Sequence, residues 1–248
     1  MGSINLMNIN SDSFHAHPMK IVVIGDIHGR FVWRNIIEQE VADIIVFLGD
    51  YVSDNNTSGN WQMANLKSIL KFKEDNPEKV ILLRGNHDMQ HLGYSWAECS
   101  GLNSHVLEEM SKMKKRFEYD TQWIYTIDNV IFSHAGLTQT WLQSIGLTES
   151  NINRINKINP NESFGFISDS PCDTIGTSKS QGITWVRPNA LIMDSIKNVT
   201  QIVGHTPVKE ICKKENKENN CCFWFCDSLP QYLVIEKRHY YIKQIETF

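Results

Sequence analysis

The chain has 248 residues, of which 41% are hydrophobic and 21% are charged, so it is long enough to bury a full core. Its formal net charge of −4 gives no basic field that would concentrate a nucleic-acid polymer, and no run approaches the roughly 20 apolar residues of a membrane-spanning helix. We therefore expect a cytoplasmic protein that binds neither membranes nor nucleic-acid polymers.

The first 18 residues are polar and lack periodicity, so we expect a flexible tail at residues 1–18 and a single domain over residues 19–248. The domain begins with a short apolar run at residues 21–24, which predicts a buried strand. A glycine closes the run, and Asp26 and His28 follow it. Such a pair after a strand usually marks only a solvated turn, so it gains meaning only where the pattern returns.

The pattern returns at the next two predicted strands. The run at residues 44–48 leads into Asp50, and the run at residues 80–83 leads into Asn86 and His87. Strands that alternate with helices predict an α/β fold, in which continuous apolar runs are covered on both faces. Amphipathic segments predict the intervening helices at residues 33–42, 61–75 and 104–117.

Two later strand ends carry histidines. His134 follows the run at residues 130–133, and His205 follows the run at residues 201–203. Residues 138–184, between these two histidines, are rich in Asn and Ser with Gly and Pro, which predicts an irregular insertion. We expect this insertion to form a lid that faces the substrate.

The six cysteines are expected to be free thiols, because a chain of this length needs no disulfide to hold its core. Three of them lie in "CCFWFC", residues 221–226. Their alternation with aromatic residues predicts a buried strand there rather than a zinc site.

The ordered recurrence of these strand ends predicts a metal site. Ligands collect beyond the carboxyl ends of the strands in α/β sheets, so the polar clusters should converge on one edge. They offer oxygen and imidazole nitrogen but no thiolate, which suits manganese, iron or zinc better than a soft metal. Two neighbouring divalent ions need a shared anionic ligand, for which Asp50 is the candidate. The predicted ligands are Asp26, His28, Asp50, Asn86, His134 and His205.

The motifs in chain order resemble those of a known family. "GDIHG", "GDYV", "LLRGNHD", "SHAG" and "GHTP" are similar to the motifs of the calcineurin-like metallophosphoesterases, and within them of the phosphoprotein-phosphatase branch. The resemblance implies a four-layer αββα sandwich, closing antiparallel strands at the C-terminus, and two divalent ions, with manganese expected first and iron or zinc as alternatives. It assigns one ion to Asp26, His28 and Asp50, and the other to Asp50, Asn86, His134 and His205.

The resemblance also implies catalytic roles. His87 would protonate the leaving group, and a carboxylate would fix the tautomer of this histidine. Arg84 and Arg187 would hold the phosphate, because the planar guanidinium binds phosphate in a bidentate manner. The chain departs from the family at "GDYVSDNN", where phosphatases normally carry Gly-Asp-x-x-Asp-Arg. The phosphate-binding arginine is missing there, and Asp54, one position late, is the candidate partner of His87.

These patterns predict a hydrolase, namely a metal-dependent phosphomonoesterase similar to Ser/Thr phosphatases, in which an activated water attacks phosphorus directly. We expect a phosphorylated substrate, either a phosphoprotein or a small phosphate ester. A nucleotide or dinucleoside-polyphosphate hydrolase is the alternative, because such members share the motifs and the missing arginine can signal a different substrate. A non-catalytic phosphate-binding module is a third hypothesis, against which the full set of metal ligands argues.

Overall fold

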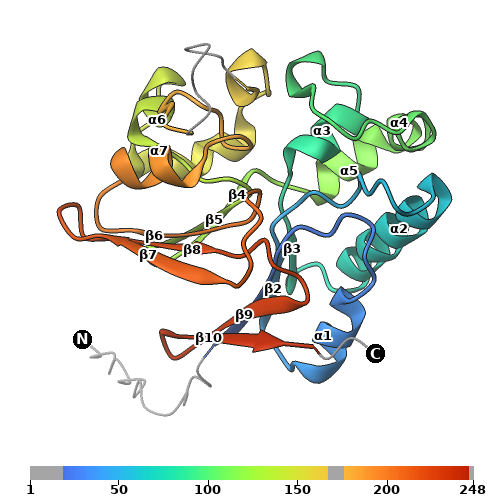
Figure 1. The fold of residues 1–248 in the computed structure, drawn as a ribbon, viewed down its shortest axis with the longest axis horizontal. Helices are drawn as coiled ribbons and strands as arrows, with labels where there is room; N and C mark the ends of the chain where they lie inside the picture. The colour runs from blue at the N-terminus through green and yellow to red at the C-terminus, as the bar shows by residue number, and fades with distance from the viewer. Residues whose placement is uncertain (1–18, 167–175, 246–248) are drawn as a thin grey trace, which may run out of the picture.

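The structure is a computed structural model of the chain, and it describes residues 19–166 and 176–245. Two five-stranded sheets, each with parallel and antiparallel neighbours, form its centre (Figure 1). The predicted tail at residues 1–18 lies outside the described residues.

The first sheet has the strand order β10-β9-β1-β2-β3. Its three central-to-edge strands β1, β2 and β3 run parallel, and the C-terminal hairpin of β9 and β10 pairs antiparallel with β1. In this register Val23 of β1 lies beside Val46 of β2 and Leu233 of β9. The strands are β1 Lys20–Ile24, β2 Ile44–Phe47, β3 Val80–Leu82, β9 Gln231–Glu236 and β10 His239–Gln244.

The second sheet has the strand order β4-β5-β6-β8-β7. β5, β6 and β8 run parallel, with Ile202 of β6 beside Phe132 of β5 and Trp224 of β8. The "CCFWFC" segment forms β8, which confirms the predicted buried strand. The strands are β4 Ile124–Ile127, β5 Val130–Ser133, β6 Thr200–Val203, β7 Cys212–Asn216 and β8 Cys221–Phe225.

Strand periodicity explains why both faces of the first sheet are apolar. Successive side chains of a strand point to opposite faces, so Val23 packs between the two sheets while Val22 packs against the outer helices. The core between the sheets joins Val23 to Phe132 and Ile202 of the second sheet. On the outer face of that sheet, Phe223 packs against Leu191. The molecule is therefore layered as helices, sheet, sheet and helices, which confirms the predicted αββα sandwich.

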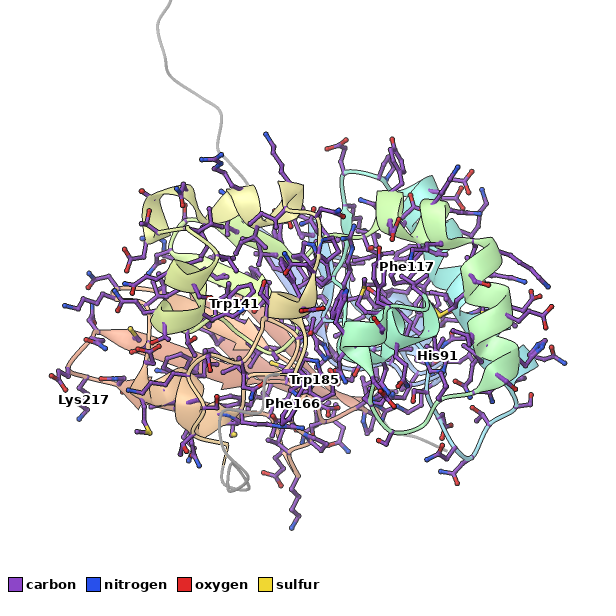
Figure 2. All side chains as sticks on the ribbon, turned by 90° about the horizontal axis from the view of Figure 1, so that it is seen from above. His91, Phe117, Trp141, Phe166, Trp185 and Lys217 are labelled. Atoms are coloured by element: carbon purple, nitrogen blue, oxygen red, sulfur yellow. The ribbon has the colours of Figure 1, made fainter. Side chains whose placement is uncertain are left out.

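The helices cover the outer faces of the two sheets. Figure 2 shows Phe117 and Trp141 in the two helical layers, on opposite sides of the molecule. Ser58 caps α2 by accepting a hydrogen bond from the Trp61 backbone N–H. The predicted helix at residues 104–117 divides at Met113, whose φ of −108° and ψ of 11° leave the helical range. The α-helices are α1 Trp33–Gln39, α2 Gly59–Asp75, α3 Asn86–His91, α4 Ser104–Lys112, α5 Lys114–Asp120, α6 Gln139–Ser144 and α7 Pro188–Met193.

The insertion predicted at residues 138–184 is more ordered than its composition indicates. Its described part contains α6 and the 3₁₀ segments Glu149–Lys157 and Glu162–Phe164, and a further 3₁₀ segment, Ser95–Ala97, lies outside it. Trp141 and Phe164 are fully buried and anchor these short helices to the core. Residues 167–175 of the insertion lie outside the described residues, and the lid function stays a prediction.

None of the helices in the described part of the chain combines the length and the apolar character that a membrane crossing requires. Every described cysteine is a free thiol, as predicted.

Candidate metal centre

Six side chains from the two sheets converge where the parallel strands end. Parallel strands β1, β2 and β3 of one sheet and β5 and β6 of the other all deliver polar residues at their carboxyl ends, where an α/β sheet collects ligands. These residues are Asp26, His28, Asp50, Asn86, His134 and His205, the complete set predicted from the sequence.

Two overlapping groups have donor atoms at the spacing of metal ligands. The donor atoms of Asp26, His28 and Asp50 lie within 4.8 Å of one another. Those of Asp50, His134 and His205 do so as well. Asp50 belongs to both groups, and it contributes a carboxylate with two oxygens, so it has the position required of a ligand shared by two ions.

Backbone carbonyls orient two of the imidazoles toward the centre. His134 Nδ1 lies 2.8 Å from the Leu48 carbonyl oxygen, and His28 Nδ1 lies 2.9 Å from the Val52 carbonyl oxygen. Each Nδ1–H donates to its carbonyl, which leaves the Nε2 lone pair facing the centre, as metal-binding histidines require. The Asn86 amide oxygen lies 3.0 Å from His134 Nε2, so this side chain completes the second group.

The backbone is strained at three of these residues. φ is +43° at His28, +49° at Asp50 and +62° at His205, although none of them is glycine. A left-handed conformation costs a non-glycine residue about 1–2 kcal/mol. Such strain persists only where the surrounding fold over-determines it, and it concentrates at functional sites.

Two glycines beside the centre are required for space. A Cβ atom on Gly85 would lie 2.0 Å from Asp50 Oδ1, and one on Gly204 would lie 2.1 Å from Asp26 Oδ1. Gly49, with φ of +110°, adopts a backbone conformation that favours glycine. At Gly85 and Gly204 the reason is instead the close approach of a carboxylate.

Burial and neighbouring charges shift the pKa values of the acidic side chains at the centre. Burial and the neighbouring Asp227 raise the pKa of Asp26 well above its usual value. Burial alone would raise the pKa of Asp50 too, but His134 and other histidines hold it well below its usual value. Burial likewise opposes the charge on His134, yet Asp50 and Asp26 raise its pKa to about 10. The two carboxylates therefore stabilise positive charge at the centre.

Asp88 fixes the backbone around Asp50. Its carboxylate accepts hydrogen bonds from the backbone N–H groups of Asp50 and Tyr51, at 2.9 and 2.8 Å, and from that of Gly85 at 2.9 Å. Burial and the Asp50 carboxylate raise the pKa of Asp88 to about 8. Asp88 thereby positions Asp50 from behind, and the sequence analysis had given it no role.

A pocket of about 450 Å³ is lined by most of the candidate metal ligands and by His87. The His87 backbone N–H donates to Asp50 Oδ1 at 3.0 Å, and the His87 ring lies 5.3 Å from the His28 ring. Its Nδ1 faces the Cys99 sulfur at 3.5 Å. The structure thus places a thiol, which the sequence analysis missed, where a carboxylate was expected.

Asp54, the predicted partner of His87, lines an adjoining hollow rather than this pocket. Its Oδ1 accepts a hydrogen bond from the Asn56 backbone N–H at 2.8 Å, which is typical of an Asx-turn. No contact supports the role predicted for Asp54.

The two predicted phosphate-binding arginines differ in position. Arg187 lines the pocket, and its Nη1 donates to the Thr206 hydroxyl at 3.2 Å. Arg84 instead donates from Nε to the Thr121 hydroxyl at 2.9 Å and stacks over Trp123. Its Nη2 donates to the backbone carbonyls of Glu118 and Thr121, so its donors fasten the end of α5 to the segment that follows β3. The geometry does not support the predicted phosphate contact of Arg84.

The sequence analysis assigned no role to Asp227. It is buried, lines both the pocket and the adjoining hollow, and lies close enough to Asp26 to raise the pKa of that carboxyl. The sequence did contain a signal for this position, because Asp227 follows strand β8 just as the candidate metal ligands follow their own strands.

Comparisons with known proteins agree with this geometry. A sequence model of the family described as calcineurin-like phosphoesterase matches residues 19–225. The chain is 30% identical over 128 residues to a Saccharomyces cerevisiae protein named serine/threonine-protein phosphatase PP2A-like PPG1, covering 48% of the chain and 33% of the relative. It is 23% identical over 212 residues to a protein of the same name from Candida albicans, covering 79% and 44%. The chain thus matches less than half the length of these curated relatives.

Solved structures share the fold. A cold-active protein-tyrosine phosphatase from a psychrophilic Shewanella species superposes with a TM-score of 0.57 at 15% identity, covering 91% of this chain and 78% of the other. A serine/threonine phosphatase from Saccharomyces cerevisiae, described as similar to human phosphatase PP5, gives a TM-score of 0.55 at 16% identity, covering 93% and 80%. At these identities the likeness shows the fold alone.

Proposed function

Because the chain belongs to the calcineurin-like phosphoesterase family, we propose that it is a metal-dependent phosphomonoesterase similar to Ser/Thr phosphatases. The observation that carries the proposal is the double membership of Asp50 in two ligand groups. The substrate is a phosphoprotein or a small phosphate ester. Free thiols throughout the described residues agree with a reducing compartment, and we place the protein in the cytoplasm.

The residues present fit two divalent ions. Oxygen and imidazole donors suit manganese first, with iron or zinc as alternatives, and the outer nitrogens of His28 and His134 are already anchored to carbonyls. One ion would be held by Asp26, His28 and Asp50, and the other by Asp50, Asn86, His134 and His205. When bound, such a pair activates a water for direct attack on phosphorus and polarises the phosphoryl oxygens.

His87 is proposed to protonate the leaving group. It lines the pocket beside Asp50 without belonging to either ligand group, so it can act on a substrate rather than on an ion. Burial lowers the pKa of His87, opposed by the Asp50 carboxylate. The Nδ1 atom of His87 faces the Cys99 thiol, which is a weaker hydrogen-bond partner than a carboxylate. His87 therefore has less support for its protonated form than the usual histidine–carboxylate pair gives.

Arg187 is proposed to hold the phosphate. It is the only lysine or arginine among the described residues that line the pocket, so it takes over the task of the arginine missing from "GDYVSDNN". The hydrogen bond to Thr206 limits the rotamers of Arg187 before any ligand arrives, which reduces the entropy lost on binding.

The test compares metal content with hydrolysis. The full chain is stripped with a chelator and reloaded with Mn²⁺, Fe²⁺ or Zn²⁺, and bound ions are counted by mass spectrometry. Phosphate release is then measured from a phosphoserine peptide, a mononucleotide and a dinucleoside tetraphosphate. We expect two ions per chain and the highest kcat/KM on a phosphomonoester. Preference for the tetraphosphate would favour the polyphosphate hydrolase, and bound ions without any hydrolysis would favour the binding module.

A further inference from the structure

One wall of the pocket is aromatic, although most of the other lining residues are polar. Phe166 belongs to the insertion and Trp185 follows it in the chain, and their rings meet edge to face at 5.5 Å and 70°. Trp185 in turn meets the ring of His205 at 5.7 Å and 83°. Figure 2 shows Phe166 and Trp185 next to each other where the two halves of the molecule join. The wall therefore runs from the metal ligands outward.

Phe166 is unusually exposed for a side chain in this position. Its relative exposure is 54%, whereas Trp185 is partly buried and the preceding phenylalanine of the insertion, Phe164, is fully buried. An exposed phenylalanine keeps apolar surface in water at a cost of about 25 cal/mol per Å², which a ligand ring would remove. Edge-to-face packing on Trp185 holds Phe166 in place and leaves part of its surface open.

The leaving group of a substrate must lie on this side of the metal centre. His87, the proposed acid, lines the same pocket as Phe166 and does not line the adjoining hollow. That hollow contains charged side chains, including Arg30, Asp54 and Lys209, and none of its described lining residues is aromatic apart from His28. An alcohol that receives its proton from His87 is therefore directed toward the aromatic wall.

We propose that Phe166 and Trp185 select phosphomonoesters whose alcohol carries a planar aromatic ring, with phosphotyrosine as the amino-acid example. This inference rests on the proposed phosphomonoesterase function and names its substrate class. The phosphate lies over the metal ligands beside Arg187, and the ring packs on the exposed surface of Phe166. Aromatic pairs prefer such offset or edge-to-face contacts, so the wall discriminates a ring from an aliphatic chain of similar size.

The test separates the effect of an aromatic ring from the effect of leaving-group ability. Phenyl phosphate has a ring and a good leaving group, benzyl phosphate has a ring and a poor one, and butyl phosphate has a poor one and no ring. In the metal-loaded protein, Phe166→Ala should lower kcat/KM about two- to tenfold on both ring substrates and less than twofold on butyl phosphate. Phe166→Leu, which retains apolar area without the ring, should give an intermediate loss.

A matched variant controls for general effects. Trp61 on α2 is 53% exposed and packs edge to face on Phe31 at 4.8 Å, but it does not line the pocket. Trp61→Ala should leave all three substrates unchanged. A phosphotyrosine peptide and a phosphoserine peptide of the same sequence test whether the ring is recognised within a polypeptide. If it is, Phe166→Ala should lower kcat/KM only for the phosphotyrosine peptide.

Binding provides a readout that needs no turnover. Calorimetry on the metal-loaded protein should show that phenylphosphonate binds more tightly than butylphosphonate, and that Phe166→Ala removes the difference. Equal losses on ring and butyl substrates, or equal binding of the two phosphonates, would overturn the inference while hydrolysis itself leaves the proposed function standing. Failure to hydrolyse any ester would instead refute the proposed function.

Discussion

The two ends of strand β1 each hold buried carboxylates, and the chain treats them differently. At the amino end, Glu40 is met by cations of the chain itself: Lys20 Nζ and Lys243 Nζ each lie 2.5 Å from a Glu40 oxygen. The Tyr232 hydroxyl donates to Glu40 as well, at 2.9 Å. Burial opposes the charge, but these hydrogen bonds, that of Lys20 foremost, lower the pKa of Glu40.

At the carboxyl end, Asp26, Asp50 and Asp227 gather without a lysine in the pocket. The backbone of Asp50 is left-handed, and the pKa of Asp26 is raised by burial and by Asp227. Burial disfavours these charges, and among the described residues they are offset by His134 and other histidines and by backbone N–H groups rather than by lysines. The comparison teaches that lysines meet the carboxylate at the amino end, whereas histidines that are themselves candidate metal ligands meet Asp50 at the carboxyl end.

The largest effect should come from removing the shared ligand. Asp50→Asn deprives both proposed ions of a charged oxygen, and the two ions together supply several kcal/mol of transition-state stabilisation. We expect kcat/KM on p-nitrophenyl phosphate to fall at least about a thousandfold, together with the metal content. Glu40→Gln at the other end of β1 is the control and should retain both. Full activity in the Asp50 variant would refute the two-ion assignment.

His87→Asn tests whether catalysis at the carboxyl end can be separated from metal binding. His87 belongs to neither ligand group, so the variant should keep both ions while losing rate by roughly a hundredfold on an alkyl phosphate. The loss should be much smaller on p-nitrophenyl phosphate, whose leaving group needs little protonation. A uniform loss with loss of metal would show that His87 is a ligand.

Arg187→Ala tests the single lysine or arginine among the described residues that line the pocket at this end. Losing a charge-assisted hydrogen bond costs about 1.5–3 kcal/mol, or roughly ten- to a hundredfold in affinity. We expect this loss in the inhibition constant of inorganic phosphate for the metal-loaded protein. Lys179→Ala, which removes an exposed cation of the insertion, is the matched control. Similar inhibition of the parent and the Arg187 variant would mean that other groups bind phosphate.

Glu40→Gln should lower stability without affecting activity. The folded-state pKa of Glu40 is depressed, so its contribution is present above the pKa of an unfolded glutamate, about 4.3, and is lost as pH falls through the folded-state value. We expect a deficit of about 1–2 kcal/mol in urea unfolding at pH 7, because the two lysines are partly exposed. The difference should shrink as the pH falls below about 4, and a constant deficit would point to lost packing instead.

Asp26→Asn should have the smallest effect on the free energy of unfolding, and it should raise stability rather than lower it. The folded-state pKa of Asp26 is raised, so in the metal-free parent its ionisation lowers stability as pH rises above the unfolded value of about 3.9. Asp26→Asn removes this charge and keeps an oxygen for the His205 N–H. The metal-free variant should therefore unfold about 1 kcal/mol less readily than the metal-free parent at pH 7, and equally readily near pH 4. Lower stability at pH 7 would show that Asp26 is structurally neutralised, as Glu40 is.

Local patterns in the sequence were sufficient to predict the strands and the convergence of the candidate metal ligands. The apolar runs before Asp26, Asp50, His134 and His205 form strands because their side chains are buried on both faces. The carboxyl ends of parallel strands lie at the same edge of a sheet, so the convergence of the residues that directly follow them could be predicted. The helix at residues 104–117 was predicted as one piece, because its periodicity continues across the break at Met113.

The sequence by itself determined the motifs at the strand ends, because each depends on a strand and the few residues after it. Those motifs gave the six candidate ligands and the resemblance to the family, and the resemblance implied the αββα architecture. Only the tertiary structure decided which long or distant side chains reach the pocket. Arg84 is adjacent to the "GNH" motif but is bound by Thr121, while Cys99 and Phe166 arrive from segments whose sequences show no strand-end pattern. Those positions depend on packing between residues far apart in the chain, which no local periodicity encodes.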